Sequence, residues 1–234
     1  MLSISNTELE KIYLRSLGAG MRSLAITSGH PGEGVSSLAV ALVQRHLLAG
    51  KSALLVDLGG HQTGEDYLLA ATLGEGQVSS TEPQLLTNES YSYALLGIPA
   101  PIGNSANLDW RNPGQLEAHV NAWLTQFDAV VIDGACFSPS TPVAISAERI
   151  VAACESVLLV VMAGVTTEPD VRHSCQRIQV AGGRLAGCVL NERYNPSLKQ
   201  EMLRESGRLP NVFGWLKTHL TRSIERNRLL SLEI

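Results

Sequence analysis

TSGHPGEGVSS, residues 27–37, lies between a short apolar run and a segment with helical periodicity. It matches the phosphate-loop pattern G-x-x-x-x-G-K-[ST] at Gly29, Gly34 and Ser36, but Val35 stands in the place of the lysine. Such a loop works because backbone N–H groups at a helix N-terminus converge on phosphate oxygens, and glycines permit that close approach. The stretch therefore predicts a strand, a phosphate-type loop and a helix, in that order.

The valine changes the chemistry that this loop can support. A loop lysine makes a charge-assisted contact with the β and γ phosphates, worth about 1.5–3 kcal/mol in binding and more during phosphoryl transfer. Valine supplies none of that charge. The residues that would meet a nucleotide at this degenerate loop are Gly29, Gly32, Glu33, Gly34, Val35, Ser36 and Ser37.

Short apolar runs alternate with helix-like segments along the chain. The runs predicted as strands are residues 23–28, 52–57, 92–98, 129–133, 156–162 and 185–190. The segments predicted as helices are residues 7–17, 37–49, 65–73, 113–126, 143–153 and 169–181. Because strands joined by helices pair in parallel and are covered on both faces, this order predicts a three-layer α/β/α fold with a mainly parallel central sheet.

Length and composition favour one domain with no nucleic-acid partner. The chain has 234 residues, and 44% of them are hydrophobic, which is ample for a buried core. We expect a single domain over residues 1–234, with an N-terminal helix within 1–20 and a helical tail over 198–234. A formal net charge of -4 gives no general electrostatic attraction to nucleic acid.

The apolar runs and the cysteines predict a cytoplasmic protein. The longest apolar run, residues 157–165, is far shorter than a transmembrane helix, and the N-terminus lacks the apolar core of a signal peptide. No transmembrane segment is expected. The four cysteines form no C-x-x-C pair, which predicts reduced thiols rather than a disulfide framework or a zinc site.

Two predicted strands end in a carboxylate. Ser36 can hold Mg²⁺ through its hydroxyl, and Asp133, at the end of its apolar run, suits the aspartate that supports such an ion. If the site is active, Asp57 and Asp133 are the candidate catalytic residues. The alternative for Asp133 is a strand-end aspartate that caps the next turn.

Several stretches resemble the bacterial tyrosine kinases of capsule and exopolysaccharide synthesis, which share their fold with MinD and ParA ATPases. They are ITS at residues 26–28, PGEG at 31–34 and AGKSALLVD at 49–57. The similarity continues through residues 112–113, 127–133, 156–161 and 187–191, and spans about residues 8–195 in all.

The resemblance implies a P-loop NTPase-like fold with ATP and Mg²⁺ as ligands. It also implies that Asn191, at the end of a G-x-V-x-N strand, lies near the adenine, and that the partners are membrane-associated components of polysaccharide synthesis or export. The chain would then lie at the inner membrane through a partner. A homodimer is a further option.

The chain departs from this family at the residues that carry charge. Val35 replaces the loop lysine, and Pro31 stands where MinD and ParA proteins have a second lysine, as it does in the kinases. Gly59 replaces the second carboxylate of an Asp-x-Asp segment, and residues 214–234 contain no tyrosine for autophosphorylation. The glutamate and arginines of the first helix do not follow the spacing of the kinases' oligomerisation helix. Tyrosine kinase activity is therefore not expected.

These matches and departures predict a pseudo-ATPase that serves as a regulatory or assembly subunit in exopolysaccharide synthesis and secretion. Its ATPase activity would be weak or absent. One alternative is a weak ATPase in which a lysine from elsewhere, such as Lys51, or from a partner chain replaces the missing charge. Lys51 lies at the far end of the predicted helix after the loop, which favours a partner chain. Another is a positioning protein of the MinD and ParA kind.

Two further features leave alternatives open. His30 and His61 lie beside the loop, and an acid–base role would need a partner group that the sequence does not show; loop histidines without such a role are the alternative. The tail places Leu216, Leu220 and Ile224 at helical spacing among arginines. It could lie on a membrane surface or pack as a helix with a solvated basic face.

Overall fold

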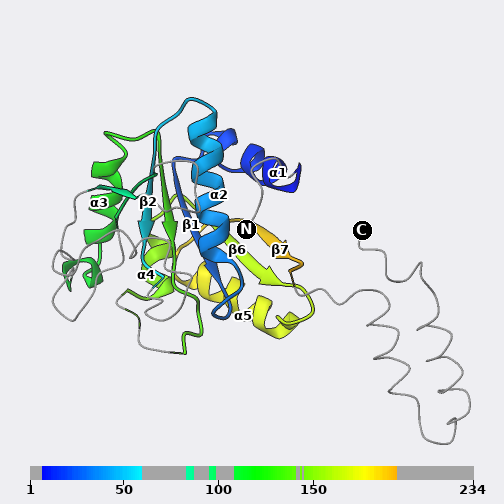
Figure 1. Ribbon diagram of the computed structural model, residues 1–234. Coiled ribbons are helices and arrows are strands. Elements are labelled where there is room, and N and C mark those ends of the chain that lie inside the picture. The colour runs from blue at the N-terminus through cyan, green and yellow to red at the C-terminus, as the bar shows by residue number, and fades with distance from the viewer. Residues whose placement is uncertain are drawn as a thin grey trace, which may run out of the picture. The chain divides into compact units, whose positions relative to one another are not determined.

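The computed structural model describes residues 7–59, 83–86, 95–98, 108–140, 143 and 145–193 (Figure 1). The expected helix over 65–73, His61 and the expected helical tail over 198–234 lie outside these residues. The chain divides into two compact units, of which the first comprises Met1–Met162 and Thr166–Asn191 and holds all the elements described below. A single domain over residues 1–234 stays a prediction.

Within the described part of the chain, seven strands form one sheet in the order β3-β4-β2-β5-β1-β6-β7. Only β3 runs antiparallel to its neighbour, at one edge, and the other pairs are parallel. The strands are β1 (Ser23–Ser28), β2 (Ala53–Asp57), β3 (Gln84–Leu86), β4 (Leu95–Ile98), β5 (Ala129–Asp133), β6 (Ser156–Met162) and β7 (Leu185–Asn191).

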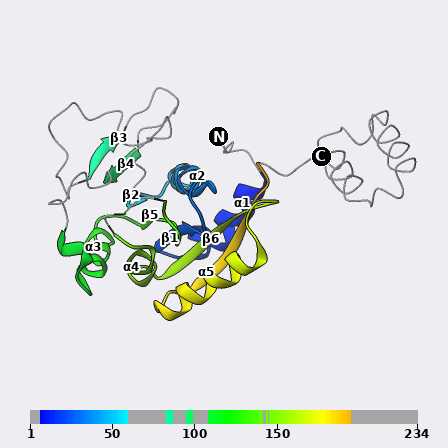
Figure 2. The same ribbon diagram turned by 90° about the horizontal axis from the view of Figure 1, so that it is seen from below.

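Helices cover both faces of the sheet, which confirms the predicted three-layer α/β/α fold. Figure 2 shows α1 and α2 on one face and α3, α4 and α5 on the other. The helices are α1 (Thr7–Arg15), α2 (Val35–Leu48), α3 (Gln115–Trp123), α4 (Ala147–Ala152) and α5 (Glu168–Val180), with short 3-10 turns η1 (Leu17–Ala19) and η3 (Leu108–Arg111).

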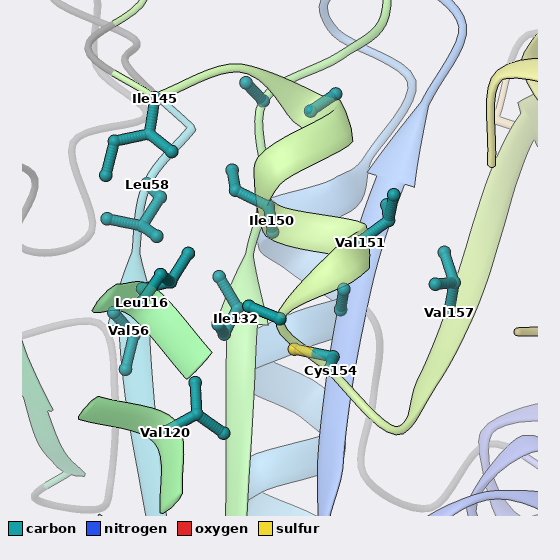
Figure 3. Packing of buried hydrophobic residues seen from close by; sticks show 14 of the residues in the cluster. Val56, Leu58, Leu116, Val120, Ile132, Ile145, Ile150, Val151, Cys154 and Val157 are labelled. Carbon is teal, nitrogen blue, oxygen red and sulfur yellow. The ribbon is translucent and has the colours of Figure 1, made fainter. Parts of the chain in front are cut away.

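Two apolar clusters, one on each face, hold the layers together. The cluster under α1 and α2 joins Leu38 and Leu42 to Ile26 of β1. The opposite cluster packs Leu116 and Ile150, from α3 and α4, onto the sheet around Ile132 (Figure 3). Because both faces are covered, β1 and β5 are buried along their whole length and read as continuous apolar runs.

The predicted boundaries shift where local backbone chemistry decides them. The helix predicted over 113–126 begins at Gln115, after Gly114 with a left-handed φ of 81°. The helix predicted over 143–153 begins at Ala147, after the extended N-cap Ser146. The strand β3 lies in a region of the sequence where no strand was predicted. Among the described residues, helix and strand types otherwise agree with the sequence patterns.

Helix α1 is fastened to α2 by a charged and an aromatic contact. The Arg45 guanidinium pairs with the Glu10 carboxylate at 2.5 and 2.8 Å and lies 4.3 Å from the centre of the Tyr13 ring. The Tyr13 hydroxyl lies 3.3 Å from Nδ1 of His46, whose side chain is 2% exposed. His46 Nε2 has no hydrogen-bond partner in the described structure. Burial, followed by the charge of Lys51, lowers the pKa of His46.

This buried histidine predicts a loss of stability in mild acid. The pKa of His46 in the fold lies below its unfolded value of about 6.5, so the unfolded chain binds more protons as the pH falls below that value. The free energy of unfolding should therefore fall as the pH drops below about 6.5, and His46→Gln should make that fall shallower. Urea unfolding across this range measures both slopes.

The matched control is His173→Gln, because His173 is exposed on α5. It should leave the slope of the wild type unchanged. An equally steep acid loss in His46→Gln and in the wild type would contradict the assignment to His46.

Candidate functional site

The loop between β1 and α2 has the strand–loop–helix path that its sequence predicts. Gly32 and Gly34 have left-handed φ values of 80° and 101°, and Gly34 is the N-cap of α2. A Cβ at Gly34 would lie only 2.5 Å from Nδ2 of Asn191, at the end of β7. Glycine is therefore required there both by conformation and by the close approach of the asparagine.

The Glu33 carboxylate braces this loop from inside. Its side chain is 3% exposed, and Oε2 accepts hydrogen bonds from the backbone N–H groups of Gly29, at 3.0 Å, and His30, at 3.3 Å. Oε1 accepts a hydrogen bond from the hydroxyl of Thr166, just before α5. A buried carboxylate is tolerated when donors of this kind replace its water shell. Glu33 therefore ties the start of the loop to the turn between β6 and α5.

Two contacts reach the loop from β7 and α5. Asn191 Nδ2 donates to the backbone carbonyl of Glu33 at 2.9 Å. His30 Nε2 lies 3.5 Å from Oδ1 of Asp170 at the solvent-facing side of the loop. Hydrogen bonds from Thr167, with a smaller contribution from His30, lower the pKa of Asp170. Asp170 is thus the polar partner of His30 that the sequence did not reveal.

The segment after β5 is hydrogen-bonded to the start of the loop. The backbone N–H groups of Phe137 and Ser138 donate to the carbonyls of Ser28 and Gly29, at 2.9 and 3.0 Å. A Cβ at Gly134 would lie 2.7 Å from the carbonyl oxygen of Ile26. The chain after Asp133 therefore passes so close to β1 that only glycine fits at that position.

Val35 is the first residue of α2 and belongs to the apolar cluster on the α1 and α2 face. Its side chain is 7% exposed. The position that a lysine occupies in the phosphate-loop pattern thus contributes to the core in this chain. Val35 therefore supplies no charge to the loop.

An acidic pair lies beside the loop, because Asp57 and Asp133 are register partners at the carboxyl ends of β2 and β5. Asp133 is 6% exposed, and its Oδ1 has no hydrogen-bond partner among the described residues. Burial and the neighbouring Asp57 carboxylate raise the pKa of Asp133 well above its usual range, although a hydrogen bond with Ser36 opposes that rise. The Asp57 carboxylate accepts a hydrogen bond from the N–H of Gly59 at 3.0 Å.

The chemistry of this pair fits a hard divalent cation. An unpartnered carboxylate oxygen and a serine hydroxyl are ligands that Mg²⁺ prefers, and the ion's charge would relieve the repulsion between the carboxylates. Ser36 and Asp133 are the residues that would hold it. The described residues contain no group of three or more His, Cys, Asp or Glu side chains placed to bind a metal. The remaining ligands of such an ion would be water or phosphate oxygens.

The structure brings the predicted loop residues together with Asn191 and places the acidic pair beside them. The nucleotide and metal roles of these residues stay predictions. Contacts that sequence reasoning missed come from Thr166, Asp170 and Ser138, which lie far from the loop along the chain. A T-x-x-D pattern at residues 167–170 signals the capping box of α5, but nothing in it indicates a contact with His30.

Comparison with known proteins identifies the fold of this chain. No family model matches the chain, and no curated protein matches it. Among solved structures, the chimerical protein CapA2B2 is 21% identical, with 79% of this chain and 83% of that one covered, at a TM-score of 0.57. The fold is that of the P-loop NTPases.

Two further solved structures share this P-loop NTPase fold, and one of them is named as a kinase domain. Apo McdA from Cyanothece is 18% identical over 73% of this chain and 72% of its own, with a TM-score of 0.56. The kinase domain of the Escherichia coli tyrosine kinase ETK is 18% identical over 80% of this chain and 74% of its own, at 0.55. The likeness thus extends to MinD/ParA-type proteins and bacterial tyrosine kinases, at the level of the fold.

In the part of the chain that the structure describes, none of the helices has the length and apolar character needed to span a membrane.

The bracing of the loop by Glu33 predicts a local loss of order on substitution. In Glu33→Ala, the amides of Gly29 and His30 lose their acceptor, so their hydrogen exchange should accelerate, with a loss of about 1–3 kcal/mol in the free energy of unfolding. Hydrogen-exchange mass spectrometry and urea unfolding measure these effects.

Glu168→Ala is the control, because that carboxylate pairs with Arg172 on the surface of α5. It should change the free energy of unfolding by no more than a few tenths of a kcal/mol. The hydrogen-exchange rates of the loop amides should change by no more than the corresponding factor. Unchanged protection of residues 29–30 in Glu33→Ala would show that Glu33 does not hold the loop.

Proposed function

We propose that this protein is a pseudo-ATPase that acts through protein–protein contacts as a regulatory or assembly subunit. The observation that carries the proposal is Val35, which occupies the lysine position of the phosphate loop and packs into the core of the α1 and α2 face. Without that charge the loop loses a contact of about 1.5–3 kcal/mol with phosphate and the larger stabilisation of phosphoryl transfer.

The internal bracing of the loop supports the same proposal. The Glu33 carboxylate accepts hydrogen bonds from the N–H groups of Gly29 and His30, and Asn191 Nδ2 donates to the backbone carbonyl of Glu33. The loop thereby has a defined shape without a bound phosphate. A loop of fixed shape, flanked by the partly exposed side chains of His30 and Asp170, suits recognition by another protein.

The pathway is proposed from the form of the loop and from the fold. PGEG at residues 31–34 is the kinase-like part of the loop, and the structures of similar fold include kinase domains of bacterial tyrosine kinases. We propose that the partners are membrane-associated components of exopolysaccharide synthesis or export, and that the chain lies at the inner membrane through them. Phosphotransfer to a tyrosine tail is not part of this function, since residues 214–234 contain no tyrosine.

A second candidate function is ATP binding with a lysine supplied by a partner chain, either another copy or a different protein. It is favoured by Asp133, whose buried Oδ1 has no hydrogen-bond partner in the described part of the chain while Ser36 is hydrogen-bonded to the same carboxyl group. Lys51 cannot replace the loop lysine in the same chain. It follows α2, whose 14 residues span about 21 Å, at the end far from the loop.

A calorimetric titration with Mg-ATP separates the two functions. A pseudo-ATPase without the loop lysine should show no binding in the micromolar range and no turnover. Affinity in that range, with turnover that disappears in Asp133→Ala, would overturn the pseudo-ATPase proposal and favour the second candidate.

Val35→Lys is the variant in which Mg-ATP binding should appear in this titration. Because Gly32, Gly34 and the N-terminus of α2 keep the geometry of a phosphate loop, restoring the lysine should create Mg-ATP binding. A gain of about tenfold or more in affinity is expected from a contact of this strength. Val35→Met, which adds length without charge, is the matched control and should not bind.

The partner class is tested by affinity purification of the full chain from native membranes. A membrane-bound synthase or export component should be recovered, and the doubly substituted His30→Ala, Asp170→Ala chain should recover less of it, because these side chains flank the loop. His173→Ala, also exposed on α5, is the control. Equal recovery by all three chains would place the contact elsewhere.

A further inference from the structure

Two cysteines face each other across the packing of α5 on β7. A turn of four residues, 181–184, reverses the chain between the helix and the strand, so the two elements run side by side in opposite directions. Cys175 lies five residues before the end of α5 and Cys188 three residues after the start of β7. At about 1.5 Å per helical residue, Cys175 lies about 7.5 Å from the turn, and at about 3.3 Å per strand residue, Cys188 lies about 10 Å from it. The two cysteines are therefore at similar distances from the turn along neighbouring elements.

The strand directs Cys188 toward the helix. Its neighbour Val189 packs against the apolar cluster of the α1 and α2 face, and successive side chains of a strand point to opposite faces. Cys188 therefore points to the face that α5 covers, where Cys175 packs against the other cluster. A side-chain hydrogen bond with Cys175 is among the causes that raise the pKa of Cys188, in agreement with this placement.

These two thiols are also the accessible ones. Cys188 is exposed and Cys175 is partly exposed, whereas Cys136 and Cys154 are buried. All four cysteines are free thiols in this structure. An oxidant in solution would thus meet the Cys175 and Cys188 pair before the other two.

We propose that Cys175 and Cys188 form a reversible disulfide bond when the protein meets a peroxide. The Cys188 thiolate attacks one peroxide oxygen, so that an S–O bond forms, the O–O bond breaks and hydroxide leaves with a proton as water. The Cys175 sulfur then attacks the sulfur of this sulfenic acid, so that the S–S bond forms and the S–O bond breaks. A second water leaves, and two electrons have passed from the thiols to the peroxide. A dithiol reductant reverses the reaction by thiol–disulfide exchange.

The disulfide would join two elements that hold the loop after β1. Helix α5 contributes Asp170, which lies beside His30, and β7 ends at Asn191, which donates to Glu33. A covalent link between them would restrict their relative movement. Oxidation would thereby stiffen the support of the loop, and reduction would relax it.

The pH dependence of the reaction follows from the thiol environment. The Cys188 residue is exposed, but its sulfur is partly removed from water by its surroundings; this desolvation, and then the neighbouring Cys175, raise the pKa of the thiol. Since the thiolate is the reacting form, disulfide formation should be slow near neutral pH and accelerate as the pH rises.

Peptide mapping of the full-length chain after treatment with hydrogen peroxide tests the proposal. Trypsin cleaves after Arg172, Arg177, Arg184 and Arg193, so the two cysteines fall on separate peptides, residues 173–177 and 185–193. We expect a linked pair of these peptides whose mass is two hydrogen atoms below their sum, and its loss on treatment with dithiothreitol. The linked pair should be absent from Cys175→Ser and Cys188→Ser chains and present in Cys136→Ser.

Three outcomes would overturn the proposal. Cys188 could be oxidised to the sulfinic acid while Cys175 stays a free thiol, or both thiols could remain unmodified at a peroxide dose that oxidises methionine side chains of the same chain. The third is a disulfide that joins Cys188 residues of two chains, seen as a dimer on a non-reducing gel. Because the wild-type chain carries the decisive measurement, the test does not depend on how well the serine variants fold.

Discussion

A buried carboxyl group governs the loop after β1. The Glu33 side chain is removed from water, and it is held by the N–H groups of Gly29 and His30 and by the Thr166 hydroxyl. A polar group in such a place must have its hydration replaced by protein donors, so the three donors are fixed in position as long as the carboxyl group is buried. The loop, the end of β1 and the turn before α5 are thereby joined at one side chain.

This arrangement separates two properties that are combined in a working phosphate loop. One is the backbone shape, which Gly32, Gly34 and the internal contacts of Glu33 maintain. The other is the positive charge, which Val35 does not supply because its side chain belongs to the core. The acidic pair of Asp57 and Asp133 lies beside the loop, and Oδ1 of Asp133 has no hydrogen-bond partner among the residues that the structure describes. The loop therefore has left-handed glycines before α2 and carboxylates beside it, but Val35 supplies no positive charge.

Helix α5 connects the loop to the edge of the sheet. Its first turn places Asp170 beside His30, and its middle places Cys175 against Cys188 of β7. The same strand ends at Asn191, which contacts the loop. A change in how α5 packs on β7 would thus reach the loop from two directions, because the helix and the strand each supply one of its contacts.

The sequence by itself determined the architecture of this protein. Continuous apolar runs such as residues 129–133 indicated strands buried on both faces, and the glycines around Val35 indicated a phosphate-type loop before a helix. Those signals are local, because they depend on the spacing of residues within one segment. The short edge strand β3 lacked such a signal, and its pairing with β4 depends on the sheet beside it.

Only the tertiary structure decided what surrounds the loop. Thr166, Asp170 and Asn191 lie more than a hundred residues from Glu33 along the chain. They reach the loop because β6 and β7 follow β1 in the sheet and α5 connects these two strands. The burial of Val35 and of Asp133 is likewise a result of packing, since exposure depends on which elements cover a residue. Sequence spacing identified the loop, whereas the contacts that hold it and the charges beside it follow from the order of the strands in the sheet.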